Sequence, residues 1–301
     1  MNLLPSQIYR QQADAGLIQD DPAQRAVVAL LDAMATALRL GPGSGLFGIR
    51  FGKPKAVKGL YLWGSVGRGK TLMTELLIAG LSGVPFQRWH FHRFMNDVHR
   101  QLAAMPDTAD TLAVLAKRIA AECRLLVLDE FFVSDIGDAM ILHRLLDQLV
   151  AHGVSFVSTS NVAPDELYPN GLQRASFLPC IALIKRECTV VELLGAQDYR
   201  LRTLRHAATY LVPPSMENEA LLVRQYQSLS GQKPAADQIE INDRCIPAKA
   251  ISAGVAWFEF RALCEGPRSA ADYIEIARDF HTLMLSGVPR FDAGNEEAAR
   301  E

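Results

Sequence analysis

Apolar residues follow two alternating patterns along the first two thirds of the chain. Short, nearly continuous apolar runs, typical of buried strands, occur at 58–63, 87–91, 124–130, 154–161 and 188–194. Between these runs the apolar residues recur every three to four positions, as on one face of a helix. The helical spacing covers 20–40, 70–81, 93–122, 170–186 and the segment between Ser134, a candidate N-cap, and Gly153, a stop signal.

Strands that alternate with helices predict an α/β fold, a three-layer α/β/α parallel sheet. After about Tyr199 the pattern changes. It predicts a helix near 217–229, short antiparallel strands within 240–260, a helix at 269–280 and a strand-like stretch at 281–289. Turns are expected at Asn242-Asp243 and Ala253-Gly254.

We therefore expect four regions. These are an N-terminal helical region with a glycine-rich loop (1–55), a core of alternating strands and helices (56–204), a smaller α+β region (205–290) and a charged tail (291–301).

Composition narrows the class of protein. The 301 residues are 49% hydrophobic with a net charge of −2, as expected of a globular chain without a field that would attract nucleic acid or an anionic membrane. Neither a long apolar span nor a secretory signal is apparent, which predicts a cytoplasmic protein, with peripheral membrane association not visible in the sequence. The five cysteines are scattered, so buried reduced thiols are expected.

The segment GSVGRGKT (64–71) matches the P-loop pattern G-x-x-x-x-G-K-[ST] between a strand and a helix. Its glycines let successive backbone N–H groups converge on phosphate oxygens, and the helix N-terminus adds positive charge. The predicted nucleotide-binding residues are Gly64, Ser65, Val66, Gly67, Arg68, Gly69, Lys70 and Thr71. In this pattern Lys70 reaches the β and γ phosphates of ATP, and Thr71 offers its hydroxyl to Mg²⁺.

Two acids end the strand LLVLDE (125–130). Asp129 is predicted to orient water bound to Mg²⁺, and Glu130 to activate the attacking water as a general base, which favours hydrolysis over a passive nucleotide switch. Asn161 ends the following strand and is predicted to position that water. Asparagine at a strand end is otherwise a common turn former.

Arg174 is predicted one turn into a helix that precedes the fifth strand. An arginine there could serve as a finger that stabilises transition-state charge on the nucleotide of a neighbouring subunit. A solvated helix arginine is the alternative. The sequence gives no chemical role for His90, His92 and Arg93, which lie close together in the chain. They offer too few ligands to bind zinc.

Taken together, these residues resemble the ZapE-type cell-division ATPases, which belong to the AAA+ class of P-loop ATPases and have mitochondrial AFG-like relatives. The matching strings are KGLYLWGSVGRGKT (58–71), HFHRFM (90–95), LDEFFVSDIGDAM (128–140), TSNVAPDELYPNGLQRASFLP (159–179), DYRLRTL (198–204) and DYIEIARDFHTLML (272–285). Relatives usually continue beyond the point where this sequence stops, which leaves open where the helical lid and its second sensor arginine lie.

The resemblance implies an ATPase that requires ATP and Mg²⁺, forms homo-oligomeric rings and acts at the division site on the tubulin-like Z-ring protein or another protein partner. It implies that Asn161 is the first sensor and Arg174 the finger.

Two alternatives stay open. The first is a nucleic-acid-handling ATPase of the helicase-loader type that uses Lys53, Lys55 and Lys58, which the near-neutral charge disfavours. The second is a scaffold that binds ATP without turning it over.

Overall fold

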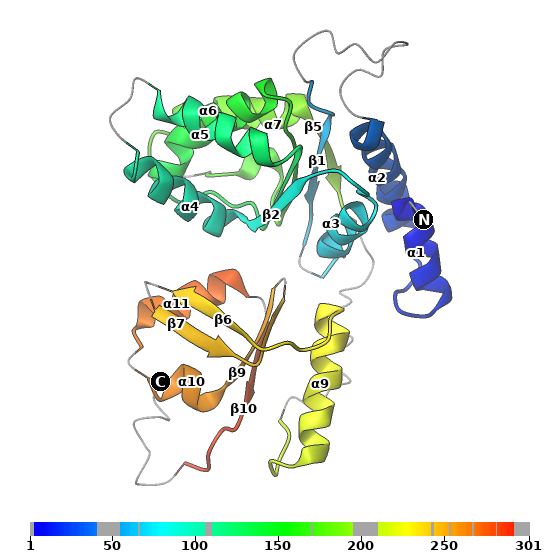
Figure 1. Cartoon of the computed structure of the whole chain (residues 1–301), viewed down its shortest axis with the longest axis vertical. Coiled ribbons are helices and arrows are strands. Elements are labelled where there is room, and N and C mark those ends of the chain that lie inside the picture. The colour runs from blue at the N-terminus through cyan, green and yellow to red at the C-terminus, as the bar shows by residue number, and fades with distance from the viewer. Residues whose placement is uncertain are drawn as a thin grey trace. The chain divides into compact units, whose positions relative to one another are not determined.

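A computed structural model describes residues 3–40, 55–65, 67–105, 110–169, 171–194, 210–241, 244–252, 254–266, 268–280 and 282–291 (Figure 1). The chain divides into two compact units, residues 1–198 and 199–301. The boundaries expected at 55, 204 and 290 lie in or beside segments outside the described residues and stay predictions.

The first unit is built on a five-stranded sheet. Its strands are β1 (Gly59–Trp63), β2 (Phe86–His90), β3 (Leu125–Asp129), β4 (Ser155–Ser160) and β5 (Cys188–Glu192). Their order in the sheet is β2-β3-β4-β1-β5, and all neighbours run parallel. The central position of β4, between β1 and β3, places the segments that follow these three strands side by side at one edge.

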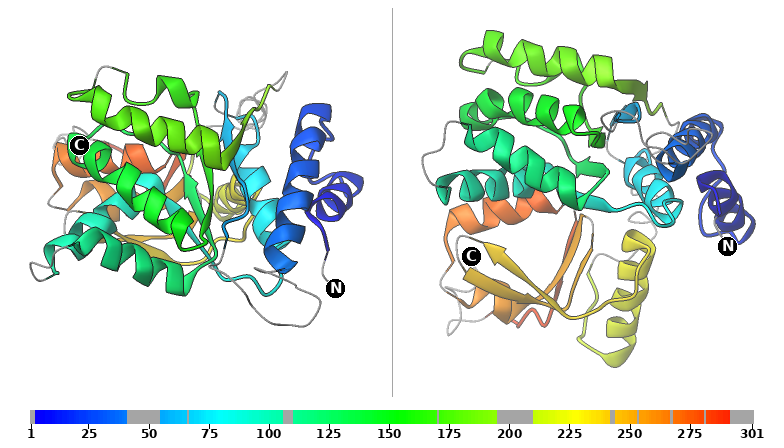
Figure 2. Two further views of the ribbon diagram at one scale, coloured as in Figure 1. Left: turned by 90° about the horizontal axis from the view of Figure 1, so that it is seen from above. Right: turned by 45° about the horizontal axis from the view of Figure 1, so that its top comes forward.

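Helices cover both faces of this sheet. They are α1 (Pro5–Asp14), α2 (Pro22–Leu40), α3 (Lys70–Ala79), α4 (Phe91–Ala103), α5 (Thr111–Glu122), α6 (Ile136–Ala151) and α7 (Arg174–Glu187), with a short 3₁₀ turn, η1 (Pro164–Glu166). Figures 1 and 2 show α1 to α3 on one side of the sheet and α4 to α7 on the other. The predicted three-layer α/β/α fold is thereby confirmed.

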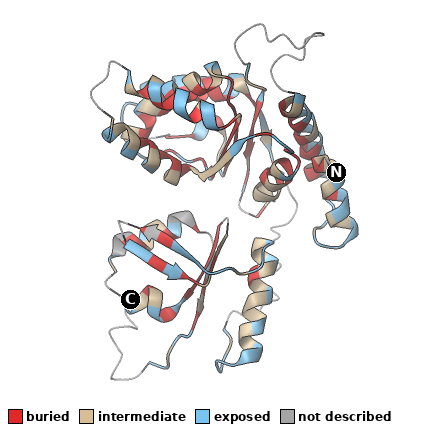
Figure 3. Ribbon diagram, viewed as in Figure 1, coloured by how far each residue is buried: buried red, intermediate tan, exposed pale blue. Residues whose placement is uncertain are grey.

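Successive side chains of β1 point to opposite faces of the sheet and pack into two separate hydrophobic cores. Tyr61 packs with residues of α4 to α7, whereas its neighbours Leu60 and Leu62 pack with residues of α1 to α3. All three side chains are almost fully buried. Figure 3 shows the buried positions gathered on the strands and on the helix faces that meet them. The near-continuous apolar runs of the sequence follow from this burial on both faces.

The second unit combines two small sheets with helices, as predicted for a smaller α+β region. Its elements are α9 (Met216–Ser230), β6 (Asp237–Ile241), β7 (Arg244–Ala248), β8 (Ala250–Ser252), β9 (Val255–Glu259), α10 (Phe260–Cys264), α11 (Ala270–Asp279) and β10 (Thr282–Ser286). The pairs β6–β7 and β8–β9 are antiparallel, and β10 joins β9 in parallel. The turn residues Asn242, Asp243 and Ala253 lie outside the described residues.

Some local predictions were wrong in detail. The N-cap of α6 is Asp135, whose carboxylate accepts from the N–H groups of Gly137 and Asp138, and not Ser134. Among the helices in the described residues, α1 and α10 were not predicted. Of the five cysteines, Cys123, Cys180 and Cys188 are buried as expected, Cys264 is partly buried and Cys245 is exposed. Burial raises the pKa of the Cys123 thiol to about 11. No helix in the described ranges is long and apolar enough to cross a membrane.

Helix α6 offers a matched test of the packing. Leu142 is fully buried and Met140, on the same helix, is 44% exposed. Leu142→Ala should lower the free energy of unfolding by about 2–5 kcal/mol, because it leaves a cavity in the core. Met140→Ala should change it by less than about 0.5 kcal/mol. Urea denaturation followed by circular dichroism measures both, and equal effects would contradict the packing of α6.

Candidate active site

The glycine-rich loop begins where β1 ends and closes against two neighbouring strands. The N–H of Gly64 donates to the carbonyl of Ser160 at 3.2 Å. Gly64 has a φ of +146°, and a Cβ there would come within 2.8 Å of the carbonyl oxygen of Leu193. Gly69, with a φ of +88°, leads directly into the first turn of α3. The predicted residue Val66 lies outside the described residues.

Lys70 reaches back across this loop. Its Nζ donates to the carbonyls of Gly64 at 2.6 Å and Ser65 at 2.9 Å, and to Oδ1 of Asn161 at 2.9 Å. The structure therefore brings Asn161, at the end of β4, together with the lysine of the P-loop. These contacts hold the curve of the loop around an ammonium group.

Asp129 lies at the end of β3 and is 5% exposed. Its Oδ2 accepts from Nε of Arg88 at 2.6 Å, and its Oδ1 accepts from the hydroxyl of Thr159 at 3.2 Å. A carboxylate this deeply buried would be costly without such partners. Arg88, on the neighbouring strand β2, supplies the opposite charge.

Glu130 follows Asp129 in a left-handed conformation, with a φ of +56°. Its N–H donates to Oγ1 of Thr159 at 3.0 Å, so one hydroxyl contacts both acidic residues. The carboxylate of Glu130 is 42% exposed, and its Oε2 lies 3.9 Å from Nδ1 of His90. The two acids thus differ in burial: Asp129 is almost fully buried beside Arg88, whereas Glu130 is partly exposed beside His90.

Arg88 also connects the acids to the helix after the P-loop. It donates to Oγ1 of Thr74 at 3.3 Å and lies 3.9 Å from the carboxylate of Glu75. Thr74 in turn donates to the carbonyl of Thr71 at 2.8 Å. The pKa of Glu75 is raised overall, because burial raises it by more than the nearby charge of Arg88 lowers it.

Helix α2 supports the loop from the other side. Gln24 is 3% exposed, and its Nε2 lies 3.4 Å from the carbonyl of Arg68, which accepts from it. A Cβ on Gly69 would come within 2.6 Å of the same nitrogen. A side chain at position 69 would therefore displace the amide of Gln24 from the loop and would also be strained by the positive φ of this residue.

Arg174 is the first residue of α7, and its hydrogen bonds stay local. Its Nε donates to the carbonyl of Tyr168 at 3.1 Å, and its Nη2 to that of Asp165 at 2.8 Å. Neither partner belongs to the P-loop or to the acidic pair, so the structure does not join Arg174 to them. The start of α7 lies at the carboxyl edge of the sheet, because α7 runs opposite to β5, which directly follows it.

Sequence reasoning missed three positioning residues, Arg88, Thr159 and Gln24. A signal for Arg88 existed, since a charged residue inside the strand QRWHF needs a partner when that strand is covered. Nothing in the sequence showed that the partner is Asp129, because the pairing of β2 with β3 is needed to bring them together.

A glycine-rich loop after β1, two acids at the end of β3 and a strand, β4, placed between β1 and β3 define a P-loop nucleotide-binding protein of the AAA+ type. The chain belongs to the AFG1-like ATPase family, whose model matches residues 3–301.

The "Cell division protein ZapE" of Escherichia coli (strain K12) is 40% identical over 99% of this chain and 84% of its own length. The "Lactation elevated protein 1 homolog B" of Danio rerio is 34% identical over 82% of this chain and 52% of its own. A crystal structure of DnaI covers 60% of this chain and 87% of its own, with a TM-score of 0.43 and 16% identity.

The contribution of the Thr159 hydroxyl to stability can be measured, with the adjacent residue Ser158 as the control. Thr159→Val removes the bonds to Asp129 and Glu130 and should lower the free energy of unfolding by about 1–3 kcal/mol. Ser158 is buried on the same strand, and its hydroxyl has no hydrogen-bond partner in the described part of the chain. Ser158→Ala should therefore be nearly neutral in the same urea titration. A neutral Thr159→Val would show that the acids do not depend on this hydroxyl.

Proposed function

We propose that the protein binds ATP with Mg²⁺ and hydrolyses it to ADP and phosphate. The observation that carries this proposal is the meeting of Lys70 with Asn161, beside the acids that follow β3, at the carboxyl edge of one sheet. The amides of residues 64–71 would bind the phosphates, and Lys70 would neutralise the β and γ phosphate charge.

Thr71 and Asp129 would hold the Mg²⁺. The fit follows from the side chains present: Thr71, the second residue of α3, offers a hydroxyl, and one carboxylate is fixed by Arg88 and Thr159 at the end of β3. In the described ranges no group of three or more His, Cys, Asp or Glu could hold a metal unaided. Mg²⁺ commonly takes one or two protein ligands and completes its shell from phosphate and water, where it stabilises charge on the γ phosphate.

Glu130 would act as the general base. Its exposed carboxylate can accept a proton from water, and its backbone is held by Thr159 in the left-handed conformation that places it after Asp129. Asn161 would orient the attacking water from the end of β4. A buried Asp129 bound to Arg88 is poorly suited to that proton transfer.

Arg174 would serve as a finger towards a neighbouring copy in a ring. Its position at the carboxyl edge supports this role, and engagement would require exchange of its bonds to the carbonyls of Asp165 and Tyr168.

The relative named for cell division in Escherichia coli supports a role for this protein at the division site, on the Z-ring or another protein partner. A fluorescent fusion that stays evenly distributed in dividing cells would contradict this. The helicase-loader alternative gains no support from the structure. Of its lysines, Lys53 lies outside the described residues.

Replacing the lysine of the P-loop should abolish binding. We expect Lys70→Ala to show no measurable ATP heat in isothermal titration calorimetry, because the ammonium is the one side-chain cation assigned to the β and γ phosphates. Lys58→Ala, just before β1, is the control and should bind as the unchanged protein does. Normal affinity in Lys70→Ala would refute the assignment of the loop.

Replacing the base should separate binding from turnover. Glu130→Gln should retain ATP while phosphate release falls roughly 10²–10⁴-fold, the usual contribution of a general base. Glu192→Gln, also an acid at a strand end, should leave the rate unchanged. If Glu130→Gln releases phosphate at the normal rate, Glu130 is not the base. If the unchanged protein binds ATP without turnover, the scaffold alternative holds.

The same variant tests assembly. Size-exclusion chromatography of Glu130→Gln with ATP should show a larger species than without it, and Arg174→Ala should then lower the turnover of the otherwise unchanged protein. A monomer under both conditions would contradict the ring.

A further inference from the structure

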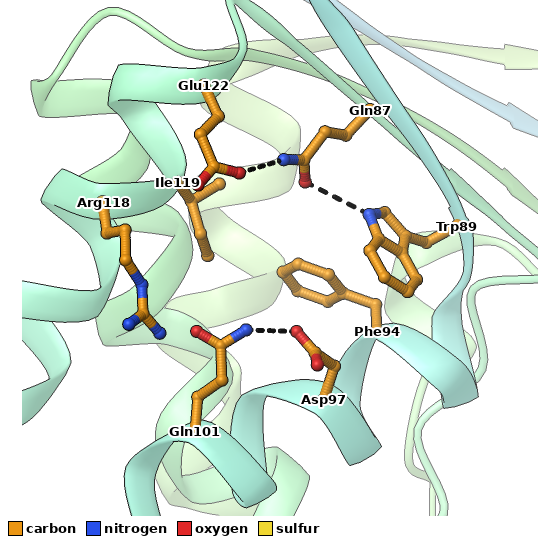
Figure 4. Close-up of a pocket in the computed structure, with 8 residues that line it drawn as sticks. All are labelled: Gln87, Trp89, Phe94, Asp97, Gln101, Arg118, Ile119 and Glu122. Atoms are coloured by element: carbon orange, nitrogen blue, oxygen red, sulfur yellow. Dashed lines mark hydrogen bonds between the residues drawn. The ribbon is translucent and has the colours of Figure 1, made fainter. Parts of the chain in front are cut away.

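A cavity lies between β2, α4 and α5 (Figure 4). Its volume is about 460 Å³, within the range of roughly 300–1,000 Å³ common for ligand sites. Gln87 and Trp89 line it from β2, Phe94 and Gln101 from α4, and Arg118 and Glu122 from α5. None of these six residues has a role in the proposed hydrolysis.

The base of the cavity is apolar. Phe94 is 3% exposed, and Ile119, which also lines the cavity, is 7% exposed. The partly buried indole of Trp89 completes an aromatic wall, as Figure 4 shows. Aromatic faces of this kind attract planar groups and cations.

The polar side chains have fixed orientations. Nε1 of Trp89 donates to Oε1 of Gln87 at 3.2 Å, and Nε2 of Gln87 donates to Oε2 of Glu122 at 2.8 Å. Because an ionised carboxylate only accepts, the amide nitrogen of Gln87 must face Glu122. This chain of bonds holds the carboxylate of Glu122 beside the aromatic wall.

Gln101 presents an acceptor that lacks a donor. Its Nε2 donates to Asp97, which Arg100 also contacts, so the amide cannot be turned around without opposing an oxygen to that carboxylate. Its Oε1 is buried and has no hydrogen-bond partner in the described part of the chain. A buried acceptor of this kind is costly unless a bound group donates to it.

The cavity therefore combines a planar aromatic wall, a carboxylate and a buried amide oxygen that needs an N–H group. We propose that it binds the guanidinium group of an arginine in a protein partner. Guanidinium is planar, carries five N–H donors, stacks on aromatic faces and forms charge-assisted hydrogen bonds with carboxylates.

Arg118 could contact the residues of the partner that lie next to the bound arginine. Its side chain is exposed, and its guanidinium has no hydrogen bond or ion pair with another side chain in the described ranges. Its guanidinium can donate to a backbone carbonyl or an acidic side chain next to the bound arginine. A neutral planar ring such as a nucleobase is the rival occupant, since it offers N–H groups without the charge.

The experiment titrates the protein with N-acetyl-arginine-amide and follows Trp89 by tryptophan fluorescence, with the Trp89→Phe variant to identify its share of the signal. We expect a saturable change with arginine, and at least about tenfold weaker binding of N-acetyl-citrulline-amide, which has the same shape without the charge. Glu122→Gln should weaken arginine binding by a similar factor. Gln101→Leu should weaken it too, with circular dichroism confirming that the fold is intact.

Glu187→Gln is the matched control, because Glu187 ends α7 as Glu122 ends α5. Its affinity for the arginine probe should be unchanged. Equal binding of arginine and citrulline, binding of adenosine alone, or the absence of saturation with any probe would overturn the proposal. These are binding measurements without ATP, so their outcome does not depend on whether the protein hydrolyses ATP.

Discussion

The pairing of β4 with β1 on one side and β3 on the other is the constraint on which the candidate site depends. Parallel strands present their carboxyl ends at one edge, so the loop after β1, the acids after β3 and Asn161 after β4 meet there. The bonds between Lys70 and Asn161, and between Thr159 and Asp129, cross between neighbouring strands. They could not both form if β4 occupied the edge of the sheet, because an edge strand pairs with only one neighbour.

Within that frame, Arg88 and Thr159 give two adjacent acids different environments. Asp129 is buried and satisfied on both oxygens, whereas Glu130 keeps its carboxylate partly in solvent. The backbone between them turns through a left-handed residue, a conformation that the bond to Thr159 supports. Burial, not residue type, therefore separates a metal-binding acid from a proton-accepting one in the proposed mechanism.

The fold and most of the candidate site could be predicted from the sequence, because both depend on patterns among residues that are close together in the chain. The apolar runs identified the five parallel strands, and the spacing of GSVGRGKT identified the loop. What could not be predicted depends on contacts between distant residues. Arg88 meets Asp129 only through the register of β2 on β3, and Gln24 meets the loop only because α2 packs on α3. The cavity beside Trp89 likewise needs three elements in place.

The two faces of strand β2 limit which mutations the protein can tolerate there. Its side chains alternate between two faces, with Gln87 and Trp89 towards the cavity and Arg88 towards Asp129. Inserting or deleting one residue in this strand would reverse every side chain, placing an indole against the buried acid and a guanidinium in the aromatic cavity. Single substitutions in β2 affect one face at a time, whereas a change in its length disrupts both together. Substitutions in β2 should therefore be tolerated more readily during evolution than insertions or deletions in this strand.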